Sequence, residues 1–401
     1  MNILALNAGS SSLKFGLYRI ATLSAGPLLT GIVEPIGTGK SEIRISQGMQ
    51  SPISEPIQAT TPSQAVESSM RRILESAAGD GQAAIDAVGC RVVHGGAKFV
   101  TPARVTASML NELRALKELA PLHNPVDVAV LEQVQRSLPE TPVFAIFDTS
   151  FHQTLPEVAF TYALPFELST RYNLRRYGFH GISHAYVSRL LIEHMGRGPE
   201  GTRIITCHLG NGASVCALRD GQSVDISMGL TPMEGLVMGT RSGDVDPGLI
   251  LYLIRTAGMT ASDVHDLLNH QSGLLGLSGV SGDVRVLEKA AEEGHKRAEL
   301  ALALFAYRTC KYIGAFAAAL GGLDAIAFAG GIGEHSASMR SRICERLHFL
   351  GLHIDNERNG TATGSRPMKI SAEDSRVGVW VIPTNEELEI AQTTYEQFRK
   401  P

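Results

Sequence analysis

The sequence is poor in several features that would direct it to particular partners. Aromatic residues make up 6% of the 401 residues, with one tryptophan, and charged residues make up 19%. The formal net charge is -4 and there is no run of lysine or arginine, so the pattern that favours nucleic acid or an anionic membrane surface is missing. We therefore expect neither nucleic acid nor a membrane as a partner.

Long apolar segments and targeting signals are also missing. The longest apolar stretch, 315–329, is interrupted by Gly321, Gly322 and Asp324, whereas a membrane-spanning helix needs about 20 apolar residues. Residues 1–6 have neither the basic start nor the apolar core of a signal peptide. The five cysteines are widely spaced without a Cys-x-x-Cys pair, which is typical of reduced thiols. These features predict a cytoplasmic protein.

The chain does have enough apolar residues, 44%, and enough length for two domains. Strand and helix signals are mixed throughout, which predicts an α/β architecture. The predicted strands are 3–6, 13–18, 87–93, 143–147, 203–208, 214–218, 325–328 and 377–382. The predicted helices are 66–77, 126–138, 183–195, 249–255, 284–292, 296–320, 338–347 and 388–398. We expect 37–62, rich in Ser, Pro, Gly and Thr, to be a surface excursion.

Two hairpins with the same pattern occur in the two halves of the chain. In the first, an apolar strand at 3–6 leads through small residues into 13–18, and in the second 204–207 leads through Gly210 and Gly212 into 214–218. Repetition of the pattern about 200 residues later suggests a duplicated domain.

Three turns have the small residues that allow backbone N–H groups to approach phosphate oxygens. The first, 7–14, adds three serines and Lys14, the second is 208–214, and the third, 329–334, lies between a predicted strand and a predicted helix. Each turn alone also fits a polar connection without a ligand. Three in one chain favour a polyphosphate, although no Walker lysine motif and no dinucleotide-binding Gly-x-Gly-x-x-Gly motif with its acidic residue is found.

Two long segments carry a specific resemblance. Asn7–Lys14 and Met233–Gly248 closely resemble the two signatures of the acetate kinase family. Further segments match that family in order and approximate spacing: 91–96, 147–152, 177–181, 208–214, 330–334 and 383–387. The likeness covers essentially the whole chain. Ile182, Ala185 and His335 stand where other residues are common in the family. These differences bear on the expected nucleotide affinity and leave the expected reaction unchanged.

The resemblance implies two duplicated ribonuclease-H-like domains of the actin-type ATPase kind, with an active-site cleft between them. The first domain is expected at 1–150 plus 385–401, and the second, nucleotide-binding domain at 151–384. The implied activity is reversible, direct in-line transfer of the ATP γ-phosphoryl group to acetate, giving acetyl phosphate and ADP. Mg²⁺ is the implied metal, for which Mn²⁺ can substitute, and a homodimer is the implied assembly. Propionate kinase, butyrate kinase and an ATP-switched actin-like binding module stay open as alternatives.

Chemistry indicates which residues would carry that reaction. Transfer to a carboxylate brings two anions together, and the forked guanidinium groups of Arg91 and Arg241 suit both of them. His180 can donate a hydrogen bond to a phosphoryl oxygen. We interpret Asp148 as an organiser of magnesium, its waters or the arginines, because a carboxylic acid substrate is already ionised at neutral pH. The alternative is that these are ordinary surface or structural residues.

The resemblance implies the binding residues, in three groups. The carboxylate substrate is expected at Arg91, Val93, Leu122, His123, Phe179 and Pro232. The nucleotide is expected at Lys14, Ser10, Ser12, His208, Leu209, Gly210, Asn211, Gly212, Asp283, Val284, Arg285, Gly331, Ile332, Gly333, Glu334 and His335. The metal is expected near Asn7 and Glu386, although an acidic residue at a helix start is also favoured by the helix dipole. An apolar pocket discriminates a methylene only weakly, so propionate should be a poorer substrate.

Overall fold

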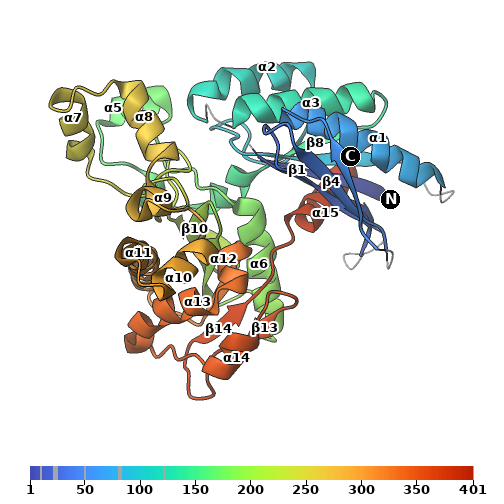
Figure 1. Cartoon of the computed structure of the whole chain (residues 1–401). Coiled ribbons are helices and arrows are strands. Elements are labelled where there is room, and N and C mark those ends of the chain that lie inside the picture. The colour runs from blue at the N-terminus through green and yellow to red at the C-terminus, as the bar shows by residue number, and fades with distance from the viewer. Residues whose placement is uncertain (10, 21–25, 49–50, 80–83, 121–122, 401) are drawn as a thin grey trace. The chain divides into compact units, whose positions relative to one another are not determined.

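The computed structural model describes residues 1–9, 11–20, 26–48, 51–79, 84–120 and 123–400. Ser10 and Leu122, two of the predicted site residues, lie outside the described residues. The chain divides into two compact units, Met1–Ser150 with Asn385–Pro401, and Phe151–Thr384. Figure 1 labels the helices and strands of each.

The first unit, as far as its residues are described, is built on an eight-stranded sheet in the order β5-β4-β3-β2-β1-β6-β8-β7. The strands are β1 Asn2–Ala8, β2 Leu13–Arg19, β3 Pro27–Glu34, β4 Ser41–Ser46, β5 Ile53–Ile57, β6 Ala87–Val92, β7 Ala103–Arg104 and β8 Val143–Phe147. The helices are α1 Pro62–Gly79, α2 Ala107–Ala115, α3 Asn124–Ser137 and α15 Glu386–Phe398, with the 3-10 segments η1 Leu116–Glu118 and η2 Asp148–Thr154. Helix α15 packs on β1 and β6.

The second unit lies wholly within the described range 123–400 and has a six-stranded sheet in the order β11-β10-β9-β12-β14-β13. Its strands are β9 Arg203–Leu209, β10 Ala213–Arg219, β11 Gln222–Ile226, β12 Ala325–Ala329, β13 Met368–Lys369 and β14 Gly378–Val381. Its helices are α4 Glu157–Phe160, α5 Phe166–Tyr172, α6 Gly181–His194, α7 Pro247–Arg255, α8 Ala261–His270, α9 Gly273–Ser278, α10 Val284–Glu292, α11 Lys296–Leu320, α12 Gly330–His335, α13 Ala337–Cys344, η3 Glu345–Leu350 and α14 Asn356–Thr361.

The two sheets share one topology. In the first, β1 pairs antiparallel with β2 and β2 with β3, while β6 and β8 continue the sheet in parallel on the other side of β1. In the second, β9, β10 and β11 form the antiparallel part, and β12 and β14 continue it in parallel. A ribonuclease-H-like arrangement therefore occurs twice, and the predicted fold class is confirmed.

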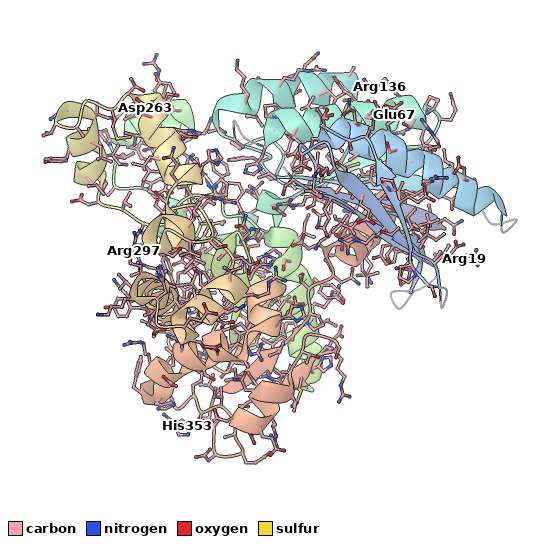
Figure 2. The ribbon with its side chains drawn as sticks, viewed as in Figure 1. Arg19, Glu67, Arg136, Asp263, Arg297 and His353 are labelled. Atoms are coloured by element: carbon pink, nitrogen blue, oxygen red, sulfur yellow. The ribbon has the colours of Figure 1, made fainter. Side chains whose placement is uncertain are left out.

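Helix ends follow local signals in the sequence. Helix α11 begins after His295, whose side chain accepts a hydrogen bond from the backbone N–H of Ala298, and ends at Gly321 with φ 69°. At α8, Thr260 and Asp263 form a reciprocal capping box. Asp263 and Arg136 are exposed at the outside of their units, as Figure 2 shows. The bounds predicted for 284–292 and 296–320 agree with α10 and α11.

Two local expectations were wrong. The segment 37–62 is not a mere surface excursion, because β4 and β5 extend the sheet and Ile43 and Ile45 are buried. The glycine-rich segment after β12 is not an open turn but the short helix α12, whose first N–H, of Gly330, donates to the Glu334 side chain at 2.8 Å. In both cases contacts made in the folded chain override weak local preferences.

The five cysteines are unpaired, and four of them are buried. No helix of the described residues has both the length and the apolar character needed to cross a membrane.

Candidate active site

The first unit holds Asn7 at the end of β1. The N–H of Gly9 donates to the carbonyl of Ser12 at 2.8 Å, which closes the turn into β2. Lys14 lies opposite Asn7 in the hairpin register. Asn7 is buried, so its side-chain amide has to be satisfied by partners from elsewhere in the unit.

Those partners are two carboxylates at the start of α15. The Asn7 Nδ2 group donates to Glu386 Oε2 at 2.7 Å and to Glu387 Oε1 at 2.9 Å. Burial and the neighbouring Glu386 raise the pKa of Glu387. Two carboxylates held together in this way favour a cation beside them. Sequence reasoning placed Glu386 here and assigned no role to Glu387, although the two are adjacent.

Arg91 lies at the end of β6 and is held by Asp148, which follows β8. The Asp148 Oδ2 atom is 2.7 Å from Arg91 Nη2 and 3.1 Å from Nε. Arg91 Nη1 is 3.4 Å from Asn7 Oδ1. Burial opposes the charge of Arg91, but the Asp148 and Glu386 carboxylates raise its pKa overall. The structure therefore brings together Asn7, Arg91, Asp148 and Glu386, four residues predicted from the sequence.

Val93 lies two residues after Arg91 and is buried, and its N–H donates to Asp127 Oδ2 at 2.8 Å. Burial raises the pKa of Asp127 to about 7. His123 is the N-cap residue of α3, the helix that carries Asp127. Sequence reasoning missed Asp127, since an acidic residue in the first turn of a helix is explained by the helix dipole alone.

In the second unit, a tight turn presents His180 at the start of α6. Gly178 has φ 76° and His180 has φ 57°, so both adopt the left-handed region. A Cβ atom on Gly178 would lie 2.7 Å from the His152 ring. His152 is itself buried, with Nε2 3.1 Å from the carbonyl oxygen of Phe179, and burial lowers its pKa to about 4. Neutral His152 thus supports the turn and donates to it.

His180 meets other predicted residues around Gly212. A Cβ atom on Gly212 would lie 3.2 Å from His180 Nε2 and 3.4 Å from Arg241 Nη2. The ring centroids of His180 and His208 are 4.4 Å apart. Glycine at 212 therefore leaves both nitrogen atoms bordering the same small space. Phe179, predicted beside them, is buried, and Pro232 accepts a hydrogen bond from Arg241 Nη1 at 2.5 Å.

The loop that carries Arg241 is anchored through Asp244. The Asp244 carboxylate accepts hydrogen bonds from the N–H of Gly235 at 2.7 Å and from the Tyr312 hydroxyl at 2.8 Å. Arg308 forms an ion pair with it at 3.2 Å. The loop also lies on the second glycine turn, since Gly239 N donates to the carbonyl of Asn211 at 2.9 Å. Helix α11 therefore fixes the loop whose tip presents the arginine.

The third glycine segment forms α12, and two buried groups hold it. Glu334 Oε1 accepts from the N–H of Gly330 at 2.8 Å and from that of Thr384 at 2.9 Å. Arg340 is fully buried and donates to the carbonyls of Gly333 and Glu334, both at 2.9 Å. Gly331 is exposed, and no atom would lie within 4 Å of a Cβ atom added there. Sequence reasoning missed Arg340, because nothing local distinguishes it from a surface arginine.

The predicted pair Asp283 and Arg285 lies at the start of α10. Asp283 is the N-cap residue, and its carboxylate lies 2.6 Å from Arg285 Nη2. Arg285 has 87% of its side chain exposed, so this ion pair belongs to the surface. The preceding Gly282 lies close to Gly239, because a Cβ atom there would be 2.8 Å from the Gly239 carbonyl oxygen.

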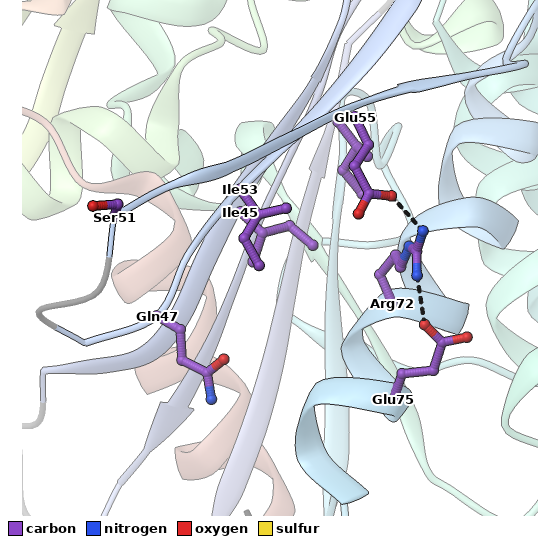
Figure 3. Close-up of a pocket in the computed structure, with 8 residues that line it drawn as sticks. Ile45, Gln47, Ser51, Ile53, Glu55, Arg72 and Glu75 are labelled. Atoms are coloured by element: carbon purple, nitrogen blue, oxygen red, sulfur yellow. Dashed lines mark hydrogen bonds and ion pairs between the residues drawn. The ribbon is translucent and has the colours of Figure 1, made fainter. Parts of the chain in front are cut away.

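A cavity of about 100 Å³ elsewhere in the first unit involves none of these residues. It lies beside β4, β5 and α1, and the described residues that line it include Ile45, Ile53 and Arg72. Figure 3 shows Arg72 reaching Glu55 and Glu75 across it. It is separate from the groups around Asn7 and Arg91.

Comparison with solved structures agrees with this architecture. The acetate kinase of Porphyromonas gingivalis is 40% identical, with a TM-score of 0.87 over 99% of this chain and 100% of that one. A propionate kinase from Francisella tularensis is 38% identical, with a TM-score of 0.90 over 98% of this chain and 99% of that one. The protein is therefore a phosphotransferase of the actin-like ATPase fold.

Sequence comparison identifies the family. The model of the acetokinase family matches residues 2–392. The acetate kinase of Dictyoglomus thermophilum is 47% identical over 396 residues, which is 98% of each chain. That of Heliobacterium modesticaldum is 46% identical over 413 residues and the full length of both. The chain belongs to the acetokinase family.

Proposed function

We propose that this protein catalyses the reversible transfer of the γ-phosphoryl group of ATP to acetate, giving acetyl phosphate and ADP. Relatives named acetate kinase match over the full chain at up to 47% identity. The observation that carries the proposal is the Arg91 guanidinium, fixed by Asp148 beside the Asn7 amide and the Glu386 carboxylate. This arrangement supplies a preorganised cation with oxygen ligands for a metal next to it.

The proposed transfer is direct and in line, and the two arginines offset the charge of the two anions that it brings together. Arg91 pairs with the acetate carboxylate, and Arg241 binds the transferring phosphoryl group as its charge redistributes. A guanidinium can make two parallel hydrogen bonds to either group, which a lysine cannot do as well. Asp148 acts on Arg91 rather than as a base, since acetate is already ionised at neutral pH.

His180 donates a hydrogen bond to an equatorial phosphoryl oxygen. Its Nε2 atom borders Gly212 together with Arg241 Nη2, which supports a shared ligand for the two side chains. A donor held in place before reaction stabilises the transition state without reorganisation.

ATP and ADP are the co-substrates, and a divalent metal ion accompanies them. No group of three or more His, Cys, Asp or Glu side chains in the described residues could hold a metal alone. The carboxylate oxygens of Glu386 and Glu387, held by the Asn7 amide, nevertheless fit Mg²⁺, which takes few protein ligands and completes its shell with phosphate and water. The bound ion would neutralise phosphate charge, and Mn²⁺ accepts the same donors.

The remaining predicted residues are proposed to bind the nucleotide and the methyl group of acetate. In the second unit, the turns 208–212 and 331–335 bind the phosphates and adenosine, with 283–285 near the ribose. Val93, in the first unit, contacts the acetate methyl group in this proposal, and Phe179 and Pro232, in the second unit, supply further apolar side chains. The buried state of Val93 and Phe179 suits an apolar wall.

Carboxylate-dependent ADP formation tests this function. Initial rates with ATP, Mg²⁺ and acetate, propionate or butyrate should give the highest kcat/KM for acetate, with propionate lower by about 10- to 200-fold. Preference for propionate would favour the second candidate, propionate kinase, for which the likeness to the Francisella tularensis protein speaks. ADP formation that no carboxylate stimulates would instead indicate an ATP-switched binding module.

We propose further that the protein works as a cytoplasmic homodimer. The use of ATP and ADP as co-substrates supports a cytoplasmic location. Large apolar side chains are exposed on α5 and α7 of the second unit, among them Phe166 at 70% and Tyr252 at 58%. Sedimentation should give twice the chain mass, and Phe166→Asp with Tyr252→Asp should give monomers. A monomeric wild-type protein would contradict the assembly.

A further inference from the structure

A chain of buried hydrogen bonds runs from the core of the second unit to His180. The Thr206 hydroxyl is 2.7 Å from His184 Nδ1, and His184 Nε2 is 2.8 Å from the Ser214 hydroxyl. The same Ser214 oxygen is 2.8 Å from His180 Nδ1. Thr206, His184 and Ser214 are all at most 1% exposed. The proposed donation from His180 to a phosphoryl oxygen does not by itself explain why these hydrogen bonds lead to Nδ1.

The direction of the chain is set at Thr206. Within the described range 123–400, the Thr206 hydroxyl forms its side-chain hydrogen bond with His184 Nδ1. A buried hydroxyl hydrogen has to be donated, so Thr206 donates and His184 Nδ1 accepts. Burial lowers the pKa of His184 well below its ordinary value, so the imidazole is neutral and carries its single proton on Nε2.

The proton of His184 then fixes the next two hydrogen bonds. His184 Nε2–H donates to the Ser214 oxygen, and the Ser214 hydroxyl has one hydrogen of its own, which it donates to His180 Nδ1. His180 Nδ1 is therefore an acceptor. A neutral imidazole with Nδ1 as acceptor carries its proton on Nε2.

We propose that His184 is a positioning residue that, through Ser214, holds neutral His180 in the tautomer with the proton on Nε2. This inference rests on the proposed function of His180 as a donor to the phosphoryl group. Nε2 is the atom that borders Gly212 beside Arg241 Nη2. The chain thus guarantees a donor at that place without requiring His180 to be charged.

Without the chain, the proton could sit on His180 Nδ1, and Nε2 would then present a lone pair to an anion. Only the imidazolium form would donate in that case. Among the described residues, the titratable groups facing His180 include His208, with ring centroids 4.4 Å apart, Arg241 across Gly212, and His184 through Ser214. Arg241 and a protonated His208 would both disfavour a positive charge on His180. A neutral donor therefore suits this environment better than an imidazolium.

The tautomer is directly measurable by NMR of protein labelled with ¹⁵N-histidine. The His180 signals are assigned by their loss in His180→Gln. At pH 8, we expect His180 Nδ1 to be unprotonated and Nε2 to be protonated in the wild type. Thr206→Val keeps the shape of the side chain and removes its donor, so protonated Nδ1 should appear at His180. A protonated His180 Nδ1 in the wild type, or an unchanged spectrum in Thr206→Val, would overturn the inference.

Kinetics give a second readout. Thr206→Val should lower kcat at pH 8 by about tenfold and leave KM values within about twofold of the wild type. The loss in kcat should be smaller than that from removing the His180 donor itself. The ratio of variant to wild-type kcat should rise as the pH is lowered, because the imidazolium carries a proton on Nε2 in either tautomer. Thr206→Ser retains the hydroxyl and should restore kcat. A purely structural role would lower kcat by one factor at every pH.

The two readouts separate the inference from the function on which it rests. If the wild-type protein phosphorylates no carboxylate, the proposed function fails, while the spectrum still decides the tautomer. If the protein is active and His180 Nδ1 carries the proton, the inference about His184 fails and the function stands.

Discussion

Arg91 and the buried Asp148 form an ion pair in which one carboxylate oxygen, Oδ2, accepts hydrogen bonds from both Nη2, at 2.7 Å, and Nε, at 3.1 Å. The two residues are 57 positions apart: Arg91 lies in β6, and Asp148 follows the adjacent parallel strand β8. Asp148 is 1% exposed. Because one edge of the guanidinium is engaged in this way, its orientation is set before any substrate binds.

Removal of Arg91 or Arg241, the two arginines proposed to bind the reacting groups, should nearly abolish activity. Arg91→Ala and Arg241→Ala each delete a charge directed at the reacting groups, so kcat/KM should fall by about three orders of magnitude, or about 4 kcal/mol. Arg72→Ala, at an exposed arginine of the first unit, is the matched control and should change kcat/KM by less than about twofold. A twofold loss in both active-site variants, folded as shown by circular dichroism, would exclude these two roles.

The role of Asp148 is testable by a double-mutant cycle. If Asp148 acts through Arg91, then Asp148→Asn lowers kcat/KM in the wild-type background but adds little in Arg91→Ala. The measured quantity is the coupling free energy from the four kcat/KM values. Additive losses would mean that Asp148 contributes independently of Arg91.

Much of this arrangement follows from the sequence, because its signals are local. Helices 284–292 and 296–320 could be predicted to the residue, since Asp283, His295 and Gly321 mark their ends. The first hairpin and Asn7 could be predicted from the small residues that follow an apolar strand. Arg91 and Arg241 came from the resemblance of their segments rather than from any pattern of charge.

The remainder depends on pairings between distant residues. The hydrogen bond from Asn7 to Glu387 joins positions 380 apart, and that from Val93 to Asp127 joins positions 34 apart. Residues 42–46 alternate between apolar and polar, but the polar composition of 37–62 favoured a surface excursion, and the pairing of β4 with β3 could not be predicted from the segment alone. Arg340 looks like any helical arginine until the carbonyls that surround it are placed.

Val93→Ala should widen the specificity for the acid. Loss of two methyl carbons next to Arg91 leaves room for a longer chain, so the ratio of kcat/KM for propionate to that for acetate should rise by one or two factors of about ten. Val92→Ala removes the same volume one residue earlier and should leave this ratio unchanged. If both variants leave it unchanged, Val93 does not line the acid pocket.

Glu386 and Glu387 should determine the metal requirement. Glu386→Ala should raise the Mg²⁺ concentration for half-maximal activity by at least about tenfold. Tenfold is the lower end of the loss in metal affinity when a residue that only supports the metal ligands is replaced. Glu389→Ala, in the same helical turn, keeps the site intact and controls for the helix dipole. An equal effect of both substitutions would reduce the role of Glu386 to helix capping.

Asp127 should make the stability depend on pH. Its pKa is about 7 in the folded protein because of burial, above the ordinary 3.8, so folding favours the protonated form. The stability it contributes is present below about pH 4 and is lost as the pH rises to about 7, by at most about 4 kcal/mol. Asp127→Asn lacks this loss, so the stability of the variant relative to wild type should increase between pH 5 and pH 8. The measurement is the urea-unfolding midpoint of the variant and of the wild type. The same difference between the two proteins at pH 5 and at pH 8 would contradict this assignment.

The stereochemistry of transfer tests the central claim most directly. ATP made chiral at the γ-phosphorus with three oxygen isotopes, incubated with acetate and the protein, should give acetyl phosphate with inverted configuration at phosphorus. A single in-line displacement inverts the centre once. Retention would show that the phosphoryl group passes through an intermediate on the protein, and formation of no acetyl phosphate would contradict the proposed function itself.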